Sequence, residues 1–154
     1  MVIADQWLKL WSTANLAGGP RRVLVEGFLG LTYFHNTGAA FGLLGNFTWG
    51  RWALTAFVIL ALMGIIWYFN RLPSEKKMWL LRVPLVLIFA GGLGNLIDRV
   101  RLGFVVDMLE FLFINFAIFN LADVFVTTGI FLLIPVSLYM GKDMPWPFGE
   151  RRDV

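Results

Sequence analysis

The sequence predicts an all-α polytopic membrane protein, a helical bundle with a shortened first helix and a small sheet at the membrane surface. Its 154 residues fit a single domain, 1–154. The chain is 58% hydrophobic and only 15% charged, with a mean hydropathy of +0.73. A soluble domain of this size could not hide that much apolar surface, and the uncharged apolar runs have the length of spanning helices.

Composition also excludes several kinds of site. The chain has no cysteine, which rules out thiolate nucleophiles, cysteine-ligated metals and disulfides. His35 is the only histidine, so two-histidine metal motifs are impossible, and we interpret it as a surface residue beside a turn. We therefore expect no metal and no cofactor. The net charge of +3 comes without a basic block dense enough for nucleic acid. Asp, Glu and Asn are left as candidate catalytic side chains.

A first helix is predicted over residues 1–17. Asp5 and Lys9 stand four positions apart, so they share a face and can pair. The segment lacks the basic start and uninterrupted apolar core of a signal peptide. It is too short and too charged to span a membrane well alone, so we interpret it as the outer part of a first helix.

The next segment, about 20–48, is predicted to form a small sheet on the outer face. Gly18-Gly19-Pro20 ends the first helix, and residues 23–34 are rich in β-branched and aromatic side chains with interspersed Gly. The stretch HNTGAAFGLLGN, residues 35–46, follows with three Gly and two Asn. We expect a one-turn helix there, lying on the membrane surface.

The rest of the chain alternates apolar runs with polar connections. The clearest spanning helix has eighteen uncharged residues with aromatic side chains at both ends. The predicted segments, in order, are a helix over 52–69, a polar turn over 72–77, a helix over 78–97, an outer connection over 98–116 that includes a strand, a helix over 119–140, and a Pro-rich tail over 141–154.

The loop charges give a slight orientation bias. Seven Lys and Arg lie near the turn after the second helix and in the tail, against five on the opposite side. This favours a cytoplasmic C-terminal tail. The opposite, outer side then collects a set of polar residues: Asn36, Asp98, Arg99, Asp107 and the outer end of the helix that carries Asp123.

Two carboxylates, Asp107 and Asp123, flank the outer end of the last apolar run. Asp123 is the only acidic or basic side chain between about Phe119 and Met140. A charged group inside a membrane costs at least about 2.5–3.5 kcal/mol, so its presence indicates a function. Asp107 lies sixteen positions earlier, in a connection that can fold back over the mouth of the helix. Two carboxylates that meet at a membrane edge suggest acid–base chemistry on a membrane-bound substrate.

Each carboxylate also has a purely structural interpretation. Asn120 and Asp123 could cap a helix that begins at residue 120, and Asp107 could be a helix N-cap. A cap needs one carboxylate, however, and more polar residues gather at the outer end of the neighbouring helix: Asn95, Asp98 and Arg99.

Five motifs resemble, in the same order along nearly the whole chain, those of the signal peptidase II family of bacterial membrane aspartic peptidases. They are Asp5-Gln6 with Lys9, NTGAAFG at 36–42, GNLIDR at 94–99, VVDM at 105–108 and FNLAD at 119–123. Each motif alone is weak, but five in order are specific. Members of the family usually carry a longer apolar stretch before the Asp-Gln pair, whereas this sequence has four residues there. This difference puts in question whether the first helix crosses the membrane.

The resemblance implies four transmembrane helices with a small β-cradle on the outer face. It also implies that Asp107 and Asp123 are the catalytic pair of an aspartic endopeptidase that needs no metal or cofactor. Asp5 corresponds to a structural aspartate of the first helix. The residues implied to line or support the site are Asn36, Gly38, Asn95, Asp98, Arg99, Asn120 and Ala122.

The implied substrate is a prolipoprotein whose cysteine carries diacylglycerol, cleaved on the N-terminal side of that cysteine. The resemblance places the enzyme in the bacterial cytoplasmic membrane, in contact with lipid and not with nucleic acid, and we expect a monomer. From the residues alone, a rival is a small proton-coupled transporter or channel component with Asp123 as its proton site. A structural assembly factor is a third possibility, and it would tolerate neutral substitutions at both aspartates.

Overall fold

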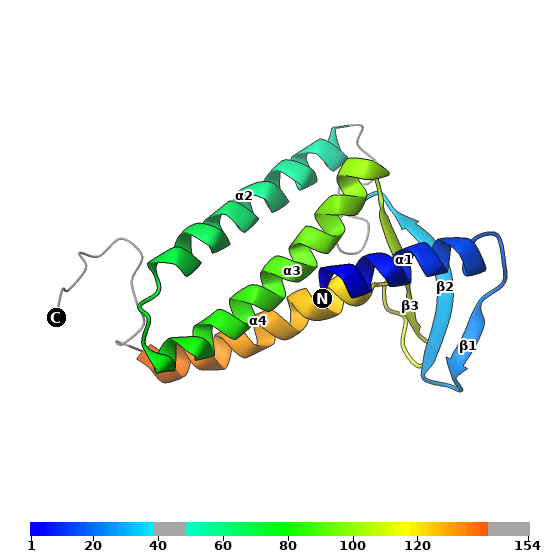
Figure 1. The fold of residues 1–154 in the computed structure, drawn as a ribbon. Coiled ribbons are helices and arrows are strands. Elements are labelled where there is room, and N and C mark those ends of the chain that lie inside the picture. Colours follow the sequence, from blue (N-terminus) through cyan, green and yellow to red (C-terminus); the bar gives the residue numbers. More distant parts are fainter. Residues whose placement is uncertain (39–48, 142–154) are drawn as a thin grey trace.

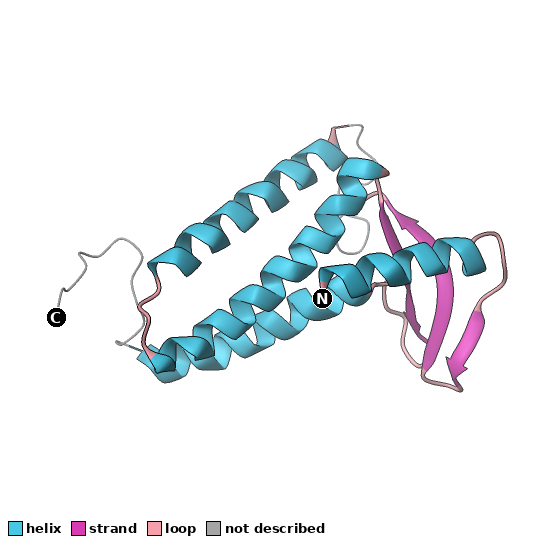
Figure 2. Ribbon diagram, viewed as in Figure 1, coloured by secondary structure: helices cyan, strands magenta, loops and turns pink. Residues whose placement is uncertain are grey.

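The computed structural model describes residues 1–38 and 49–141, which fold into long helices and one antiparallel sheet (Figure 1, Figure 2). The elements, in chain order, are α1 (Val2–Leu16), β1 (Arg22–Val25), β2 (Leu29–Asn36), α2 (Gly50–Arg71), a short 3-10 turn η2 (Lys76–Met78), α3 (Trp79–Arg101), β3 (Val105–Phe111) and α4 (Leu121–Met140).

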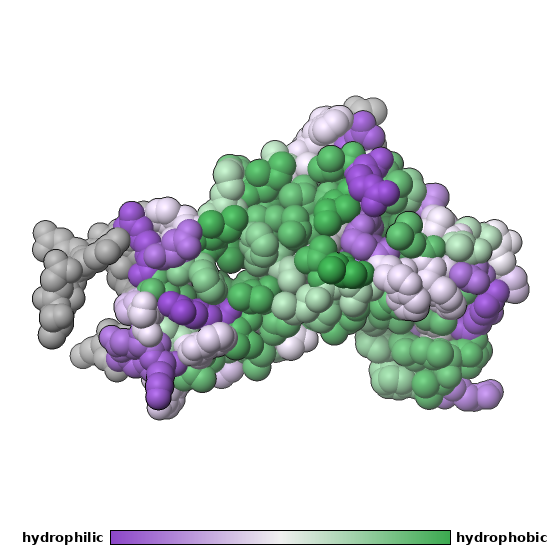
Figure 3. Space-filling view, viewed as in Figure 1, coloured by the Kyte–Doolittle hydropathy of each residue, from purple (hydrophilic) through white to green (hydrophobic). Residues whose placement is uncertain are grey.

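Three helical segments of the described residues are long and apolar enough to cross a membrane. They are α2, with 22 residues, η2 with α3, with 26, and α4, with 20. Large apolar side chains on these helices face outward, such as Phe57 at 68% exposed and Phe131 at 70%. Figure 3 shows this hydrophobic surface over the helices. The chain is a mostly helical, multi-pass membrane protein.

The first helix, α1, has only 15 residues. At 1.5 Å per residue it is about 22 Å long, which is short of a hydrocarbon core of about 30 Å. It packs instead against α3, α4 and strands β2 and β3, and Figure 1 shows it running from the start of α4 toward the sheet. The described residues thus hold three candidate spans, and the four spans that the resemblance implies stay a prediction.

Glycines bring α3 and α4 into close contact. A Cβ at Gly91 would collide with the backbone oxygen of Ala122, and one at Gly129 would lie 2.8 Å from the backbone oxygen of Pro84. Small residues at a helix interface let two backbones approach in this way. Helices α3 and α4 therefore form the central pair of the bundle, and α2 packs against α3.

The sheet has the order β1-β2-β3, with both pairs antiparallel. Phe34 of β2 lies opposite Asp107 of β3, and Asn36 lies opposite Val105. The C-terminal end of α1 covers the sheet, where Leu16 packs with Val106 and Met108. Because residues 105–108 are all buried, β3 is enclosed on both faces.

Two elements differ from the predicted segments. Helix α3 continues to Arg101, so Asp98 and Arg99 lie in its last turn and not in a polar connection. The backbone N–H groups of Leu102 and Gly103 close the helix on the carbonyls of Asp98 and Arg99. Strand β3 runs from 105 to 111, so the interpretation of Asp107 as a helix N-cap is wrong.

Two further predictions fall outside the described residues. The one-turn helix expected in the stretch after His35 lies on residues 39–48, and the polar tail lies almost entirely on residues 142–154.

Candidate active site

Asp107 and Asp123 converge on one residue, Asn120. The Asn120 side-chain amide donates a hydrogen bond to Asp107 Oδ1 at 2.6 Å, and its backbone N–H donates to Asp123 Oδ2 at 3.0 Å. Asp107 comes from the buried centre of β3 and is 1% exposed, whereas Asp123 lies in the first turn of α4 and is partly exposed. One asparagine therefore links a strand carboxylate to a helix carboxylate.

The start of α4 explains how Asp123 is held. Asn120 is the N-cap, its Oδ1 accepts from the backbone N–H of Asp123 at 3.0 Å, and Asp123 returns the contact as a capping box. The capping interpretation is thus correct for these two residues. The capping box uses only one oxygen of Asp123, Oδ2. The other, Oδ1, accepts from the Asn95 amide at 2.8 Å. The cap therefore also directs a carboxylate toward a group of polar side chains that we call the polar cluster: Asp5, Gln6, Lys9, Asn36, Asn95, Asp98, Arg99, Asp107, Asn120 and Asp123.

Asn95, on α3, is the second junction of the cluster. Its Oδ1 accepts from the Asn120 amide at 3.0 Å and from Lys9 Nζ at 2.8 Å, while its own amide donates to Asp123. The Lys9 ammonium also lies 3.0 Å from both Asp5 Oδ2 and Asp98 Oδ2. An ammonium has three hydrogens, and all three have a partner here.

The two aspartates beside Lys9 hold backbone groups in place. Asp5 Oδ1 accepts from the N–H of Ala122 at 2.9 Å, which satisfies an amide in the first turn of α4. Asp98 accepts from the N–H of Val106 at 3.1 Å, next to Asp107, and from the Gln6 amide at 3.0 Å. These contacts fix α4 and β3 relative to α1 and α3.

Asn36, Gly38 and Arg99 form the wall on the side of the sheet. Asn36, at the end of β2, donates to Asp107 Oδ2 at 3.0 Å and accepts from the N–H of Gly38 at 3.0 Å. Arg99 Nη2 donates to the Gly38 carbonyl at 3.1 Å. Both oxygens of Asp107 thus accept a hydrogen bond from an asparagine amide.

The protonation of Asp107 is set by its surroundings. Burial, and then the negative charge of Asp123, raise the pKa of the Asp107 carboxyl to about 7, against the opposing hydrogen bonds from Asn36 and Asn120 and the charge of Lys9. A carboxyl with this pKa can both hold and release a proton near neutral pH. The arrangement is therefore suited to general acid–base chemistry.

Sequence reasoning paired Lys9 with Asp5 but did not place Lys9 or Gln6 in the cluster. The position of Lys9 between Leu8 and Leu10, in a helix with few charges, could have indicated its place in the cluster. A buried ammonium is costly unless it finds polar partners. All the predicted site residues lie in or beside the cluster. His35 does not: it is exposed and stacks on Phe104 at 3.9 Å.

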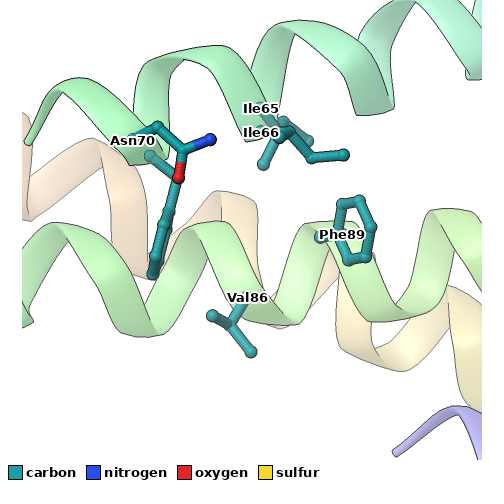
Figure 4. Close-up of a pocket in the computed structure, with 6 residues that line it drawn as sticks. Ile65, Ile66, Asn70, Val86 and Phe89 are labelled. Carbon is teal, nitrogen blue, oxygen red and sulfur yellow. The ribbon is translucent and has the colours of Figure 1, made fainter.

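Neither a metal centre nor an apolar cavity accounts for the candidate site in the described residues. No group of three or more His, Asp or Glu side chains there could hold a metal ion. A cavity of about 200 Å³ lies between α2 and α3 and is almost wholly apolar (Figure 4). Its lining residues are Ile65, Ile66, Phe69, Asn70, Val86 and Phe89. None of them belongs to the polar cluster, so this cavity is not the candidate active site.

Comparison with known proteins gives consistent relatives. Residues 1–139 match the family described as signal peptidase (SPase) II. A lipoprotein signal peptidase of Streptococcus thermophilus strain CNRZ 1066 is 44% identical over 130 residues, covering 84% of this chain and 82% of the relative. One of Streptococcus pyogenes serotype M6 is 39% identical over 143 residues, covering 93% and 90%.

The fold also matches a solved structure. A bacterial membrane enzyme, determined by the in meso method at 2.3 Å resolution, superposes with a TM-score of 0.78 at 30% identity, covering 94% of this chain and 86% of that one.

Proposed function

Because the chain belongs to the signal peptidase II family and cleaves signal peptides from lipoproteins, we propose that it does so as an aspartic endopeptidase with Asp107 and Asp123 as its catalytic pair. It is a protease of the bacterial cell membrane, and the comparisons do not support a transporter. The observation that carries the proposal is the shared contact with Asn120, through which both carboxylates reach one place.

In the mechanism that we propose, the resting pair shares one proton, which we assign to Asp107, and Asp123 carries the negative charge. Its pKa of about 7 supports Asp107 as the proton holder, because two neighbouring carboxylates cannot both ionise easily. Such a pair titrates as a unit. Cleavage by such a pair needs no metal or cofactor, because the two carboxylates carry out the proton transfers.

Cleavage then follows in two balanced steps. A water oxygen bonds to the peptide carbon as Asp123 takes one water proton and Asp107 gives its proton to the carbonyl oxygen. The neutral tetrahedral intermediate collapses when Asp123 protonates the amide nitrogen, the C–N bond breaks, and a hydroxyl proton returns to Asp107. The remaining donors of Asn36 and Arg99 hold the substrate backbone and stabilise charge on the carbonyl oxygen. Asn120 supports the site by positioning the two carboxylates.

The position of the pair suits a substrate anchored by lipid. Asp123 lies three residues beyond the N-cap of α4, which is about 4.5 Å into the helix at 1.5 Å per residue. A diacylglyceryl-modified cysteine keeps the bond on its N-terminal side near the membrane interface. We place this end of the bundle at the outer face, the C-terminal tail in the cytoplasm, and the enzyme as a monomer.

Replacing either aspartate tests the proposal. Asp107→Asn and Asp123→Asn keep the size and planar shape of the side chains but remove proton transfer. We expect each to lose cleavage of a diacylglyceryl-modified prolipoprotein by at least about 10²–10⁴-fold. The readout is the rate of signal peptide release by purified, membrane-inserted protein.

Glu75→Gln is the matched control, because Glu75 is exposed in the turn before α3 and, among the residues that the structure describes, forms an ion pair with the exposed Lys77. It should cleave at the parent rate. Substantial cleavage by either aspartate variant, with folding intact, would count against an aspartic pair.

A further inference from the structure

One end of the sheet carries an exposed apolar surface that plays no part in the polar cluster. We call it the hairpin patch, and its residues are Val25, Phe28, Phe113, Ile114 and Phe116. Each is between 44% and 56% exposed. Figure 3 shows hydrophobic side chains gathered over this end of the sheet, at the lower right of the view. Contiguous apolar surface of this kind marks an interaction site.

The hairpin patch is rigid, because rings and backbone hold it together. Phe28 stacks on Phe113 with ring centroids 5.2 Å apart and planes within 4° of parallel. The N–H of Leu112 donates to the carbonyl of Phe28 at 3.0 Å. The β1–β2 turn and the segment after β3 therefore present one preformed surface.

The hairpin patch is continuous with the start of a membrane span. Phe111 contacts Phe113 at 5.5 Å and Phe119 at 4.9 Å. Phe119 directly precedes Asn120, the N-cap of α4, and its N–H donates to the carbonyl of Leu109 at 2.9 Å. A chain of aromatic rings thus leads from the sheet end to the point where an apolar helix begins.

The chemistry of the hairpin patch favours lipid over a protein partner. Its five side chains carry no hydrogen-bonding group that could direct a specific docking partner. Beside it, Arg21 is already paired with Glu110 at 2.7 Å, and all four residues of β1 are exposed on both faces. Lipid rewards apolar surface without requiring complementary shape, and aromatic side chains suit the interface.

We propose that the hairpin patch lies in the headgroup–acyl boundary of the leaflet at which α4 begins, as a second contact of the protein with the bilayer. Strand β3 carries both Asp107 and Phe111, so this contact holds the depth of the strand that bears Asp107. The lipid contact itself does not depend on the proposed catalytic roles.

The absence of cysteine from the sequence allows a direct test. Phe28→Cys and Phe113→Cys, each carrying a nitroxide spin label, are reconstituted into phosphatidylcholine–phosphatidylglycerol vesicles. Collision of the label with oxygen and with a water-soluble nickel chelate reports whether it lies in lipid or in water. Phe131→Cys, in α4, is the lipid reference. Ser74→Cys, exposed in the polar turn between the candidate spans α2 and α3, is the water reference.

We expect the labels at 28 and 113 to favour oxygen over the nickel chelate, as at 131, and the label at 74 to do the reverse. Labels at 28 and 113 that behave like the one at 74 would overturn the proposal. Protection from both reagents would also overturn it, because it would show a protein surface covering the hairpin patch.

A second arm reads the functional consequence. The double variant Phe28→Ser with Phe113→Ser should cleave prolipoprotein several-fold more slowly than the parent in vesicles and at the parent rate in detergent. Ala14→Ser should match the parent in both. Equal rates in vesicles, or the same loss in detergent, would contradict a role for lipid contact, and the label measurements separate this result from a failure of the catalytic assignment.

Discussion

The Lys9 ammonium is buried between the carboxylates of Asp5 and Asp98 and is only 3% exposed. The two carboxylates would repel each other without it, and both bind backbone N–H groups that the fold needs, those of Ala122 and Val106. A buried charge that loses its partner is costly, because neither water nor another group replaces the contact. Lys9 is therefore expected to contribute strongly to stability.

Lys9→Met tests this expectation. The change keeps most of the side-chain length, removes the charge and leaves two buried carboxylates unpaired, so it should lower the free energy of unfolding by about 3–5 kcal/mol. Denaturant unfolding in micelles measures the loss. Lys77→Met removes a lysine whose ion pair with Glu75 is about half exposed, at 3.4 Å, and should change stability by no more than about 1 kcal/mol.

A double-mutant cycle separates charge from packing. Asp98→Asn keeps an acceptor for the Val106 N–H but removes one of the two carboxylates. Combined with Lys9→Met, it should cost less than the sum of the single changes. Additive losses would contradict an electrostatic role for Lys9.

The pKa of Asp107 predicts how cleavage depends on pH. It lies at about 7, above its ordinary value, so the carboxyl is protonated below that pH and loses its proton as pH rises through it. If Asp107 must hold the proton, the cleavage rate falls on the alkaline side of about pH 7. Asn36→Ala removes a hydrogen bond that favours the ionised form, which raises the pKa further and moves the alkaline limb to higher pH.

A pH–rate profile of kcat/KM for prolipoprotein cleavage measures this shift. His35→Asn is the control, because it removes the only histidine, which is exposed and lies next to Asn36 in sequence. Its profile should match that of the parent. An alkaline limb that disappears in His35→Asn, or stays fixed in Asn36→Ala, would contradict the assignment to Asp107.

At the scale of single elements, the contact between α3 and α4 has almost no spare room. A Cβ at Gly129 would lie 2.7 Å from Ile88 Cγ1 and 2.8 Å from the Pro84 carbonyl oxygen. The Pro84 oxygen belongs to the backbone and cannot easily move. The same two helices carry Asn95 and Asp123, so their separation also sets the geometry of the polar cluster.

Gly129→Ala is expected to destabilise the protein by about 1–3 kcal/mol through overpacking. It should also reduce cleavage, since it displaces α4 from α3. Gly64→Ala is the matched control: Gly64 is a glycine of α2 with nothing within 4 Å of an added Cβ, so alanine there is expected to be neutral or slightly stabilising. Thermal unfolding of both variants checks the contrast, and equal behaviour would show that the interface can relax.

Element boundaries were the part of the fold least open to prediction. The polar stretch after Ile97 suggested a connection, yet α3 continues to Arg101 because Asp98 and Arg99 find partners in the cluster and the helix closes on their carbonyls. The connection was expected to include a strand, but the sequence did not indicate that β3 runs from Val105 to Phe111 with its first four residues, Asp107 among them, all buried. Long-range partners, and not local propensity, decide both cases.

At the scale of the molecule, sequence patterns predicted the class of protein and the region of the site. Long apolar runs predicted the three candidate spans, because hydrocarbon imposes a length on helices. Asp123 was singled out because charge is expensive in such surroundings, and Asp107 because its connection can fold back over the same end of the helix. The pairing of Lys9 with Asp5 was predicted from their spacing, but the contact of Lys9 with Asp98 was not, since Asp98 lies about ninety positions away and their meeting depends on how α1 packs.

The hydrogen bond from the N–H of Ala122 to Asp5 joins the first helix of the chain to its last. During synthesis, Asp5 and Lys9 leave the ribosome long before Asn120 and Asp123. A partly made chain therefore contains the carboxylate of β3 without the second carboxylate of the proposed pair. On that proposal, the chain can cleave a substrate only after its last helix has been made and has docked on the first.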